Sequence, residues 1–363
     1  MEEHKIKINY WLTPFSLLYG IGVALRNKLF DWRILHSRQF NIPTICIGNL
    51  TVGGTGKTPH TEYLIKLLQE DLQVAVLSRG YRRDSKGFVL ASTESSVKEM
   101  GDEPFQMKQK FPAAHIAVDA NRCEGIERLC KTATPTPKVI LLDDAYQHRY
   151  VKAGLNILLT DYNRPVYEDA LLPAGRLRES LFGKKRADII IVTKCPPDIE
   201  EETYEEITRQ LKPASWQQLF FSTFVYGELF PLDKENGHAR TLDTLRDDDQ
   251  ILLITGIASP YQLLSNLKKY TNQVQLMEYP DHHAFTEEDI SEISRKYQQM
   301  DRDKRVIITT EKDATRLIHH PNLTEELRKA IYILPIKVEF MQDKQEMFNK
   351  QIIDYVNKNT RNG

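Results

Sequence analysis

The chain has 363 residues, of which 41% are hydrophobic and 27% charged, so it can fill two packed cores and a disordered chain is excluded. Acidic and basic residues nearly cancel to a formal net charge of −1, which argues against bulk electrostatic binding of nucleic acid. The four cysteines lack metal-ligand spacing and are typical of small buried residues in a reducing compartment.

The first forty residues combine an apolar run with basic residues. No charge occurs from Ile8 to Leu25, and the stretch that follows interleaves arginine and lysine with large apolar side chains. Pro14 and two glycines argue against a membrane span, whereas the mixed apolar and basic composition is typical of a helix at a membrane interface. We therefore expect residues 1–40 to bind a membrane surface that carries anionic lipid. A helix buried on the protein itself is the alternative.

A glycine-rich loop follows the short apolar strand Pro43–Ile47 and precedes leucines at helical spacing. Its glycines allow backbone N–H groups to face an anion, and the start of the next helix adds partial positive charge. Lys57 would reach the β- and γ-phosphates of a nucleotide, and the Thr58 hydroxyl would hold Mg²⁺. A glycine-rich turn with a solvated lysine is the alternative. The residues expected to contact the phosphates are Thr51, Val52, Gly53, Gly54, Thr55, Gly56, Lys57 and Thr58.

Two later loops carry charges of opposite sign. The strand predicted at Val74–Leu77 ends in a basic loop with Arg79 and Tyr81, which suits an anionic substrate, although a solvated basic loop is equally consistent with the sequence. Asp102 and Glu103 stand side by side where a helix begins, and on their own they could cap that helix.

A second phosphate-site motif follows the apolar strand Val139–Leu142. Asp143 and Asp144 end this strand and have the form of a Walker B element, whose acid holds Mg²⁺ opposite the glycine-rich loop. His148 comes a few residues later, within reach of the same site. A turn further along the chain bears Arg178, which could neutralise phosphate charge.

Short apolar runs alternate with helical stretches as far as about residue 212. This pattern predicts a parallel sheet with helices on both faces and a ligand at the carboxyl ends of the strands. A second, smaller α/β set begins at Ile251 and contains no further glycine-rich loop. We expect an N-terminal segment at 1–40, a P-loop domain of the NTPase type at 41–222 and a smaller α/β domain at 223–363.

The second set contains a histidine pair. His282 and His283 follow Asp281, and a histidine oriented by a carboxylate is suited to proton transfer. A helix N-cap with surface imidazoles is the alternative.

Together these motifs closely resemble the tetraacyldisaccharide 4'-kinases of lipid A biosynthesis. The resemblance runs from the N-terminal apolar segment to Asp313. Thr51 in place of the usual first glycine of the loop is itself a feature of this family. The blocks that carry the resemblance are residues 51–59, 77–81, 101–104, 142–148, 172–179, 281–285 and 310–313.

The resemblance implies a P-loop kinase that uses ATP and Mg²⁺. Such an enzyme transfers the γ-phosphate to the 4'-hydroxyl of a tetraacylated glucosamine disaccharide 1-phosphate. It would act as a peripheral protein at the cytoplasmic face of the inner membrane, with no obligate protein partner and no nucleic acid. The lipid substrate agrees with the interfacial segment inferred above.

The resemblance also implies roles for single residues. Asp102 would be the base for the sugar hydroxyl and His282 would support it, although the sequence does not decide between His282 and His283. The remaining roles are catalysis by Lys57, nucleotide binding by Arg178, Mg²⁺ binding by Thr58, Glu103, Asp143 and Asp144, and substrate binding by Arg79, Tyr81 and His148.

A nucleotide-gated switch that docks on membranes, similar to a GTPase, is the second hypothesis. Thr193 and Lys194 at a strand end resemble part of a guanine-reading element, but Cys195 and Pro196 replace the aspartate that would pair with the base. ATP consumption in step with lipid phosphorylation separates the kinase from the switch.

Overall fold

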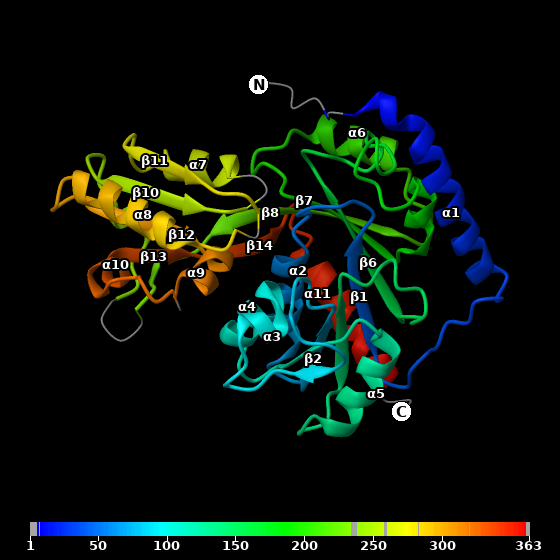
Figure 1. Cartoon of the computed structure of the whole chain (residues 1–363). Helices are drawn as coiled ribbons and strands as arrows, with labels where there is room; N and C mark the ends of the chain where they lie inside the picture. The colour runs from blue at the N-terminus through cyan, green and yellow to red at the C-terminus, as the bar shows by residue number, and fades with distance from the viewer. Residues whose placement is uncertain are drawn as a thin grey trace. The chain divides into compact units, whose positions relative to one another are not determined.

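In the computed structural model, the apolar runs of the sequence form the strands of two sheets (Figure 1). The structure describes residue 6 and residues 8–233, 238–257, 260–281, 283–318 and 320–360. One unit comprises residues 1–224 and 338–363, and the other residues 225–337. The expected α/β architecture, a large parallel-sheet domain and a smaller α/β domain, is confirmed.

The expected second domain and the second unit begin at nearly the same residue, but they end at different residues. We expected residues 223–363 to form the second domain, but residues 338–363 belong to the first unit. The reason is the apolar face of α11 (Gln345–Thr360), which buries Phe348, Ile352 and Val356 in the core that contains Ile45.

The first unit is built on a nine-stranded sheet with the order β14-β8-β7-β6-β1-β5-β2-β4-β3. Neighbouring strands from β8 to β4 are parallel, and β3 is antiparallel to β4. The strands are β1 (Thr44–Asn49), β2 (Val74–Ser78), β3 (Val89–Leu90), β4 (His115–Val118), β5 (Val139–Asp143), β6 (Leu155–Asp161), β7 (Ile189–Thr193), β8 (Gln218–Tyr226) and β14 (Ile336–Phe340).

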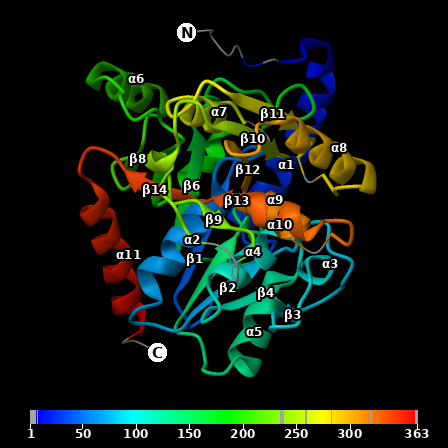
Figure 2. The same cartoon turned by 90° about the vertical axis from the view of Figure 1, so that its left-hand side faces the viewer.

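Helices cover both faces of this sheet because its strands are apolar on both sides. Ile45 and Ile47 pack into one core with α2 (Lys57–Leu68), α4 (Asp102–Lys110) and α11, while Cys46 packs into the other core with α5 (Arg122–Thr132) and α6 (Glu201–Leu211). Figure 2 shows these helices beside the strands of the first unit. The helical segments are η1 (Tyr10–Leu12), α1 (Thr13–Asp31), α2 (Lys57–Leu68), α3 (Val97–Met100), α4 (Asp102–Lys110), α5 (Arg122–Thr132), η2 (Leu181–Arg186), α6 (Glu201–Leu211) and α11.

The strand order places two motifs next to each other. β1 lies in the middle of the sheet between β5 and β6, and Ile47 of β1 pairs with Asp143 of β5. The glycine-rich loop after β1 and the acidic pair at the end of β5 therefore leave the same edge of the sheet, where parallel α/β sheets bind ligands.

The second unit contains a five-stranded sheet with the order β11-β10-β12-β13-β9. Helices α8, α9 and α10 pack on one face and α7 on the other. The elements are β9 (Phe230–Pro231), η3 (Leu242–Thr244), β10 (Gln250–Thr255), α7 (Tyr261–Leu267), β11 (Val274–Glu278), α8 (Glu287–Gln299), β12 (Arg305–Thr310), α9 (Glu311–Leu317), α10 (Glu325–Ala330) and β13 (Ile331–Leu334).

Helix α1 exposes most of its apolar side chains. Within the helix, only Ser16 and Phe30 are buried. None of the helices in the described parts of the chain has the length and apolarity required to cross a bilayer. The large apolar side chains that are between 55% and 92% exposed on and beside α1 are Tyr10, Trp11, Phe15, Leu17, Leu18, Ile21, Leu25, Trp32 and Ile34.

Candidate active site

The glycine-rich loop after β1 and the first two residues of α2 together make up residues 51–58, the expected phosphate cradle. Gly56 is the N-cap of α2 and has a φ of 83°, a left-handed conformation that favours glycine. A Cβ atom at this position would lie 2.8 Å from the Phe224 ring, so space excludes a side chain as well. Gly53 has a φ of 118°. The loop therefore needs both glycines to place its N–H groups at the start of α2.

Residues 171–178 run alongside the start of the cradle. The Val52 N–H donates to the Arg176 carbonyl oxygen at 2.8 Å, and the Arg178 N–H donates to the Leu50 carbonyl oxygen at 2.7 Å. Thr51 and Leu177 form an antiparallel bridge. These backbone bonds explain how an arginine more than a hundred residues away in the sequence reaches the cradle.

Lys57 and Arg178 converge on one carboxylate. Asp144 Oδ1 lies 3.6 Å from Lys57 Nζ and 3.0 Å from Arg178 Nη1, and Arg178 Nη2 is 3.4 Å from the second oxygen. Burial alone would raise the pKa of Asp144, but Lys57 and Arg178 outweigh it and lower that pKa. Asp144 has a φ of 44°, which is unusual for a residue other than glycine and typical of functional sites.

The pKa of the neighbouring Asp143 is shifted in the opposite direction. Its side chain is buried and accepts hydrogen bonds from Ser78 Oγ at 3.0 Å and from Thr61 Oγ1 at 3.4 Å. Burial, together with the negative charges of Glu103 and Asp144, raises the pKa of Asp143 from 3.8 to about 6. Burial and its acidic neighbours therefore both disfavour the ionised form of Asp143.

A buried arginine lies behind the acidic pair. Arg122 is 2% exposed and donates to the carbonyl oxygens of Asp119 at 2.8 Å and of Asp143 at 3.2 Å. Burial lowers the pKa of Arg122, while the charges of Asp143 and Asp144 oppose this shift. Arg122 thus fixes the backbone where β5 ends and keeps positive charge below the carboxylates.

The basic loop and the second acidic pair lie against each other. A Cβ atom on Gly101 would meet the Tyr81 carbonyl oxygen at 2.8 Å, so glycine permits the close approach of the two loops. Asp102 and Glu103 follow directly as the first residues of α4, where the helix dipole favours carboxylates. The charge of Glu103 reaches Asp143, which brings the two acidic pairs into one electrostatic site.

The expected substrate-binding residues lie around this site. Tyr81 is 60% exposed, and the guanidinium of Arg82 lies 5.5 Å from its ring centre. Burial lowers the pKa of His148 to about 4, assisted by the positive charges of Arg122, Arg26 and Arg79. His148 is therefore a neutral imidazole at physiological pH, and Arg79 belongs to the same basic surroundings.

The histidine pair of the second unit is described for one member only, because His282 lies outside the described residues. His283 Nε2 lies 2.7 Å from Asp289 Oδ2, and its ring stacks on Tyr279 with centres 4.8 Å apart. Thr286 and Asp289 also form the capping box of α8. His283 thus has a structural role within its own unit.

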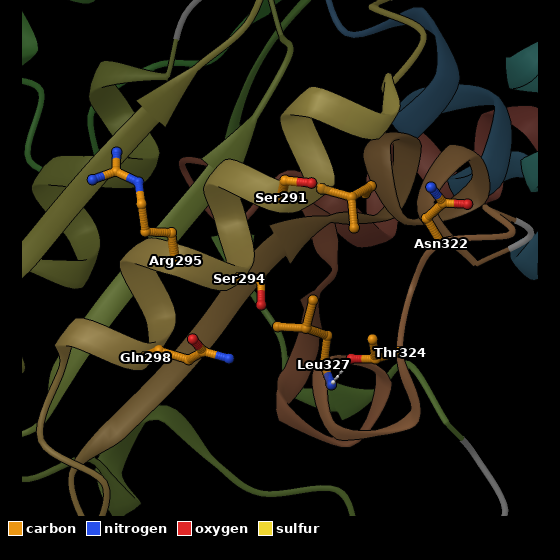
Figure 3. A pocket seen from close by; sticks show the side chains of 8 residues that line it. Ser291, Ser294, Arg295, Gln298, Asn322, Thr324 and Leu327 are labelled. Carbon is orange, nitrogen blue, oxygen red and sulfur yellow. Dashed lines mark hydrogen bonds between the residues drawn. The ribbon is translucent and has the colours of Figure 1, made fainter.

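The second unit contains a surface pocket. It has a volume of about 300 Å³ between α8 and the segment before α10, with Ser294, Gln298 and Thr324 in its lining (Figure 3). Its lining residues lie between positions 290 and 327 and include none of the expected site residues. Phosphate binding by a glycine-rich loop relies on backbone N–H groups and does not require such an enclosed space.

Several residues of the site were not predicted from the sequence. Ser78 and Thr61 hold Asp143, and Arg122 supports it from below. The sequence offers a weak signal for Ser78, which is a polar residue at the end of an apolar strand. Thr61 lies one helical turn after Lys57, so it faces the same side of α2. Nothing in the local pattern indicates Arg122.

Comparisons with known proteins agree on one family. The profile of the family described as "Tetraacyldisaccharide-1-P 4'-kinase" matches residues 8–356. A tetraacyldisaccharide 4'-kinase of Bacteroides fragilis is 57% identical over 366 residues, covering 100% of this chain and 97% of the relative. One of Phocaeicola vulgatus is 56% identical over 363 residues, covering 100% and 99%.

A solved structure extends the likeness to three dimensions. The crystal structure of LpxK from Aquifex aeolicus in complex with ATP is similar to this chain with a TM-score of 0.74 and 28% sequence identity. The match covers 96% of this chain and 99% of that one.

Proposed function

The chain belongs to the tetraacyldisaccharide-1-P 4'-kinase family, and we propose that residues 51–58, the carboxylates beside them and Arg178 form its catalytic centre. The enzyme is a kinase that transfers the γ-phosphate of ATP to the 4'-hydroxyl of a tetraacyl disaccharide 1-phosphate. The expectation of this activity from the sequence is confirmed, and the second hypothesis, a membrane-docking switch, finds no support in the relatives.

One observation carries the assignment of the catalytic centre. Lys57 and Arg178 both lie within 4 Å of Asp144 Oδ1, at 3.6 Å and 3.0 Å, and Lys57 begins the helix that follows the glycine-rich loop. Phosphoryl transfer depends mainly on positioning and on neutralising charge at the transferred group, so two cations at a phosphate-binding loop are the functional parts it needs. We assign Lys57 to the β- and γ-phosphates and Arg178 to charge neutralisation there.

The residues around Asp143 suit Mg²⁺. Carboxylate and hydroxyl oxygens are the ligands that Mg²⁺ prefers, and Thr58, Glu103, Asp143 and Asp144 supply them. Burial raises the pKa of Asp143 most, and the negative charges of Glu103 and Asp144 add to the shift; a divalent cation would offset these charges. When bound, Mg²⁺ would neutralise the β- and γ-phosphate oxygens.

The acids form no complete metal cage by themselves. Over the described ranges, no group of three or more His, Cys, Asp or Glu side chains has metal-binding geometry. Mg²⁺ in kinase sites is commonly bound through one or two carboxylates, with substrate phosphates and water completing the shell. Asp143 and Asp144 match that smaller requirement.

For the proton of the sugar hydroxyl we assign Asp102 as the base. It is the first residue of α4, and a carboxylate is a group that can accept the proton of an attacking hydroxyl. The support that we expect from His282 stays a prediction.

The acceptor lipid would be bound by Arg79, Tyr81 and His148. Arg79 supplies positive charge for an anionic group, and the exposed Tyr81 ring offers an apolar face with a polar tip. His148 is neutral, so it would bind by hydrogen bonding rather than by charge.

Helix α1 is the proposed membrane-binding element, at the cytoplasmic face of the inner membrane. Its exposed apolar side chains include Phe15, Leu17, Leu18, Ile21 and Leu25, within a stretch that carries no charge, and basic residues follow. A patch of this kind suits the headgroup region of a bilayer with anionic lipid, where the lipid substrate also resides. The proposal includes no nucleic acid and no obligate protein partner.

The experiment that tests this function measures two quantities in one reaction. Purified protein is incubated with γ-labelled ATP and the tetraacyl disaccharide 1-phosphate, and both ADP and labelled lipid are counted. We expect one labelled lipid per ADP, and 31P NMR should place the new phosphate at the 4'-position. ATP hydrolysis without labelled lipid would refute the kinase assignment and favour a nucleotide switch.

A further inference from the structure

Three consecutive carbonyl groups of the cradle accept hydrogen bonds from side chains outside the loop. Lys194 Nζ donates to the Gly54 carbonyl oxygen. Thr193 Oγ1 donates to the Thr55 carbonyl oxygen at 2.9 Å, and His60 Nδ1 lies 2.7 Å from the Gly56 carbonyl oxygen. The sequence motif contains none of these three donors, which come from the end of β7 and from the second turn of α2.

From this geometry we infer that Thr193, Lys194 and His60 are positioning residues that hold the cradle ready for phosphate. The inference rests on the proposed function, in which the cradle binds ATP. In a planar trans peptide, the carbonyl of one residue and the N–H of the next point in opposite directions. Donors that hold the carbonyls of Thr55 and Gly56 on one side therefore direct the N–H groups of Gly56 and Lys57 to the other side.

Lys194 does not serve as a free cation for phosphate. Its ammonium lies 2.7 Å from Asp161 Oδ2, at the end of the neighbouring strand β6, and its side chain is 19% exposed. The pair with Asp161 compensates the charge, so the contact with Gly54 fixes the backbone of the loop. Lys194 has a φ of 58°, a conformation in which a lysine is uncommon.

Thr193 connects the cradle to the sheet. The residue is fully buried. Its hydroxyl oxygen lies 2.9 Å from the Thr55 carbonyl oxygen and 3.2 Å from the Thr160 carbonyl oxygen. A hydroxyl carries one proton, and the shorter contact is with the cradle. A threonine at this place therefore gives the loop a fixed point on β7.

His60 completes the set from inside α2. A carbonyl oxygen only accepts, so Nδ1 carries the proton toward Gly56 and Nε2 accepts from Ser222 Oγ at 3.0 Å. The imidazole is 3% exposed, and Phe224 and Phe340 lie beside it. This packing fixes the ring, whose contact with the Gly56 carbonyl oxygen adds to the helical hydrogen bond that the same oxygen accepts from the His60 N–H at 3.2 Å.

The test compares ATP binding by variants that remove one donor each. Thr193→Val keeps the shape of the side chain and loses the hydroxyl, and Lys194→Met keeps the stem and loses the ammonium. Because each deletes a hydrogen bond that organises the loop, we expect the ATP Kd from isothermal titration calorimetry to rise about 5- to 30-fold. The KM for lipid should stay within about twofold of the wild-type value, because the substitutions weaken only the binding of ATP.

Two further variants separate positioning from general loss of stability. Thr193→Ser restores the hydroxyl and should restore the ATP Kd to within about twofold of wild type. Lys184→Met is the matched control, because Lys184 also donates to backbone carbonyl oxygens, those of Leu211 and Lys212 at the end of α6. It should lower the Tm without changing ATP binding.

Three results would overturn the inference: wild-type ATP affinity in Thr193→Val and Lys194→Met, no rescue by Thr193→Ser, or an equal loss of affinity in Lys184→Met. A lowered Tm with unchanged ATP Kd would assign these residues a purely structural role. Failure of the proposed function can be distinguished from failure of this inference. If wild-type protein binds ATP but transfers no label to lipid, the kinase proposal fails, while the ATP Kd values of the variants still test how the cradle is held.

Discussion

Asp143 is the side chain at which stability and function oppose each other most directly. It is buried, and its pKa is raised to about 6 by burial and by the charges of Glu103 and Asp144. At neutral pH the folded protein must therefore hold an ionised carboxylate in surroundings that disfavour it. The unfolded chain has no such constraint, so Asp143 destabilises the ligand-free fold in this pH range.

Asp143→Asn should stabilise the ligand-free protein above pH 6 and abolish most of its activity. The folded pKa exceeds the ordinary value of 3.8, so the contribution of Asp143 to stability is present below pH 3.8 and is lost as the pH rises to about 6. We expect a gain of about 1–3 kcal/mol in the free energy of unfolding at pH 7.5, shrinking toward pH 4. Urea denaturation across this range measures it.

Asp169→Asn is the matched control for that experiment. The Asp169 carboxylate accepts from Arg164 Nε at 2.6 Å and from the backbone N–H of Arg176 at 3.1 Å. These hydrogen bonds outweigh burial and lower the pKa of Asp169, so the same substitution should decrease stability there. If both variants lose stability at pH 7.5, the description of Asp143 is contradicted.

Helix α1 is connected to the proposed nucleotide site through residues 171–178. Ser16 Oγ donates to the Leu171 carbonyl oxygen at 3.0 Å and accepts from the Ala174 N–H at 2.9 Å. The Tyr19 hydroxyl donates to the carbonyl oxygen of Arg178 at 2.7 Å. One face of α1 therefore holds the backbone that carries Arg178, while apolar side chains such as Phe15, Leu18 and Ile21 are exposed.

The membrane-binding proposal predicts that loss of the exposed apolar side chains of α1 weakens binding of lipid but not of ATP. The triple variant Phe15→Gln, Leu18→Gln and Ile21→Gln removes exposed apolar side chains and leaves the contacts of Ser16 and Tyr19 intact. Burial of each side chain in a bilayer is worth about 1.5–3 kcal/mol, so binding to anionic lipid vesicles should fall at least about tenfold. The KM for lipid should rise, and the ATP Kd should not change.

The control for this variant is Trp216→Gln together with Phe182→Gln. These side chains are 62% and 75% exposed on the same unit, but they do not belong to α1. Vesicle binding should be unaffected by them. If the triple α1 variant sediments with vesicles as wild type does, α1 is not the membrane-binding element.

The expected proton-transfer pair joins residues from the two halves of the chain. Asp102 belongs to the first unit, and position 282 falls within the second. If the two act together, Asp102→Asn and His282→Asn should each lower kcat, by up to about 10²–10⁴-fold for the base. The double variant should be little worse than the more damaging single variant, because residues that act as a unit are not additive.

His283→Asn tests whether that coupling is specific. His283 is bound to Asp289 within its own unit, so its loss should reduce stability and multiply independently with the effect of Asp102→Asn. If the effect of His282→Asn on kcat also multiplies independently with that of Asp102→Asn, His282 does not take part in the proton-transfer step.

The sequence predicts the sheet of the first unit well because local pattern determines it. Val74–Leu77 and Val139–Leu142 are apolar runs between helical stretches, and both are strands buried on their two faces. The glycine loop and the acidic pair are likewise local motifs, and the fold rule for parallel sheets brings them together. Family likeness supplies the reaction, which no pattern of apolar residues indicates.

Contacts between distant segments could not be predicted. The sequence of residues 345–360 does not indicate that their apolar face packs with Ile45 rather than with strands of the second unit that are nearer in the sequence. The same holds for Thr193 and His60, which reach the cradle only once β7 lies two strands from β1 and α2 begins at Lys57. Thr193 and Lys194 resemble part of a guanine-reading element in sequence, whereas in the structure Lys194 contacts the cradle backbone.

The most direct test of the kinase centre is the transfer of label from γ-labelled ATP to lipid by Lys57→Met, compared with Lys66→Met. Both lysines lie on α2, but Lys57 contacts Asp144 beside the cradle and Lys66 is exposed further along the helix. Loss of a cation at the transferred phosphate should lower kcat about 10²–10³-fold in Lys57→Met, with Lys66→Met close to wild type. Equal activity of the two variants, in folded protein, would contradict the assignment of this loop as the catalytic phosphate site.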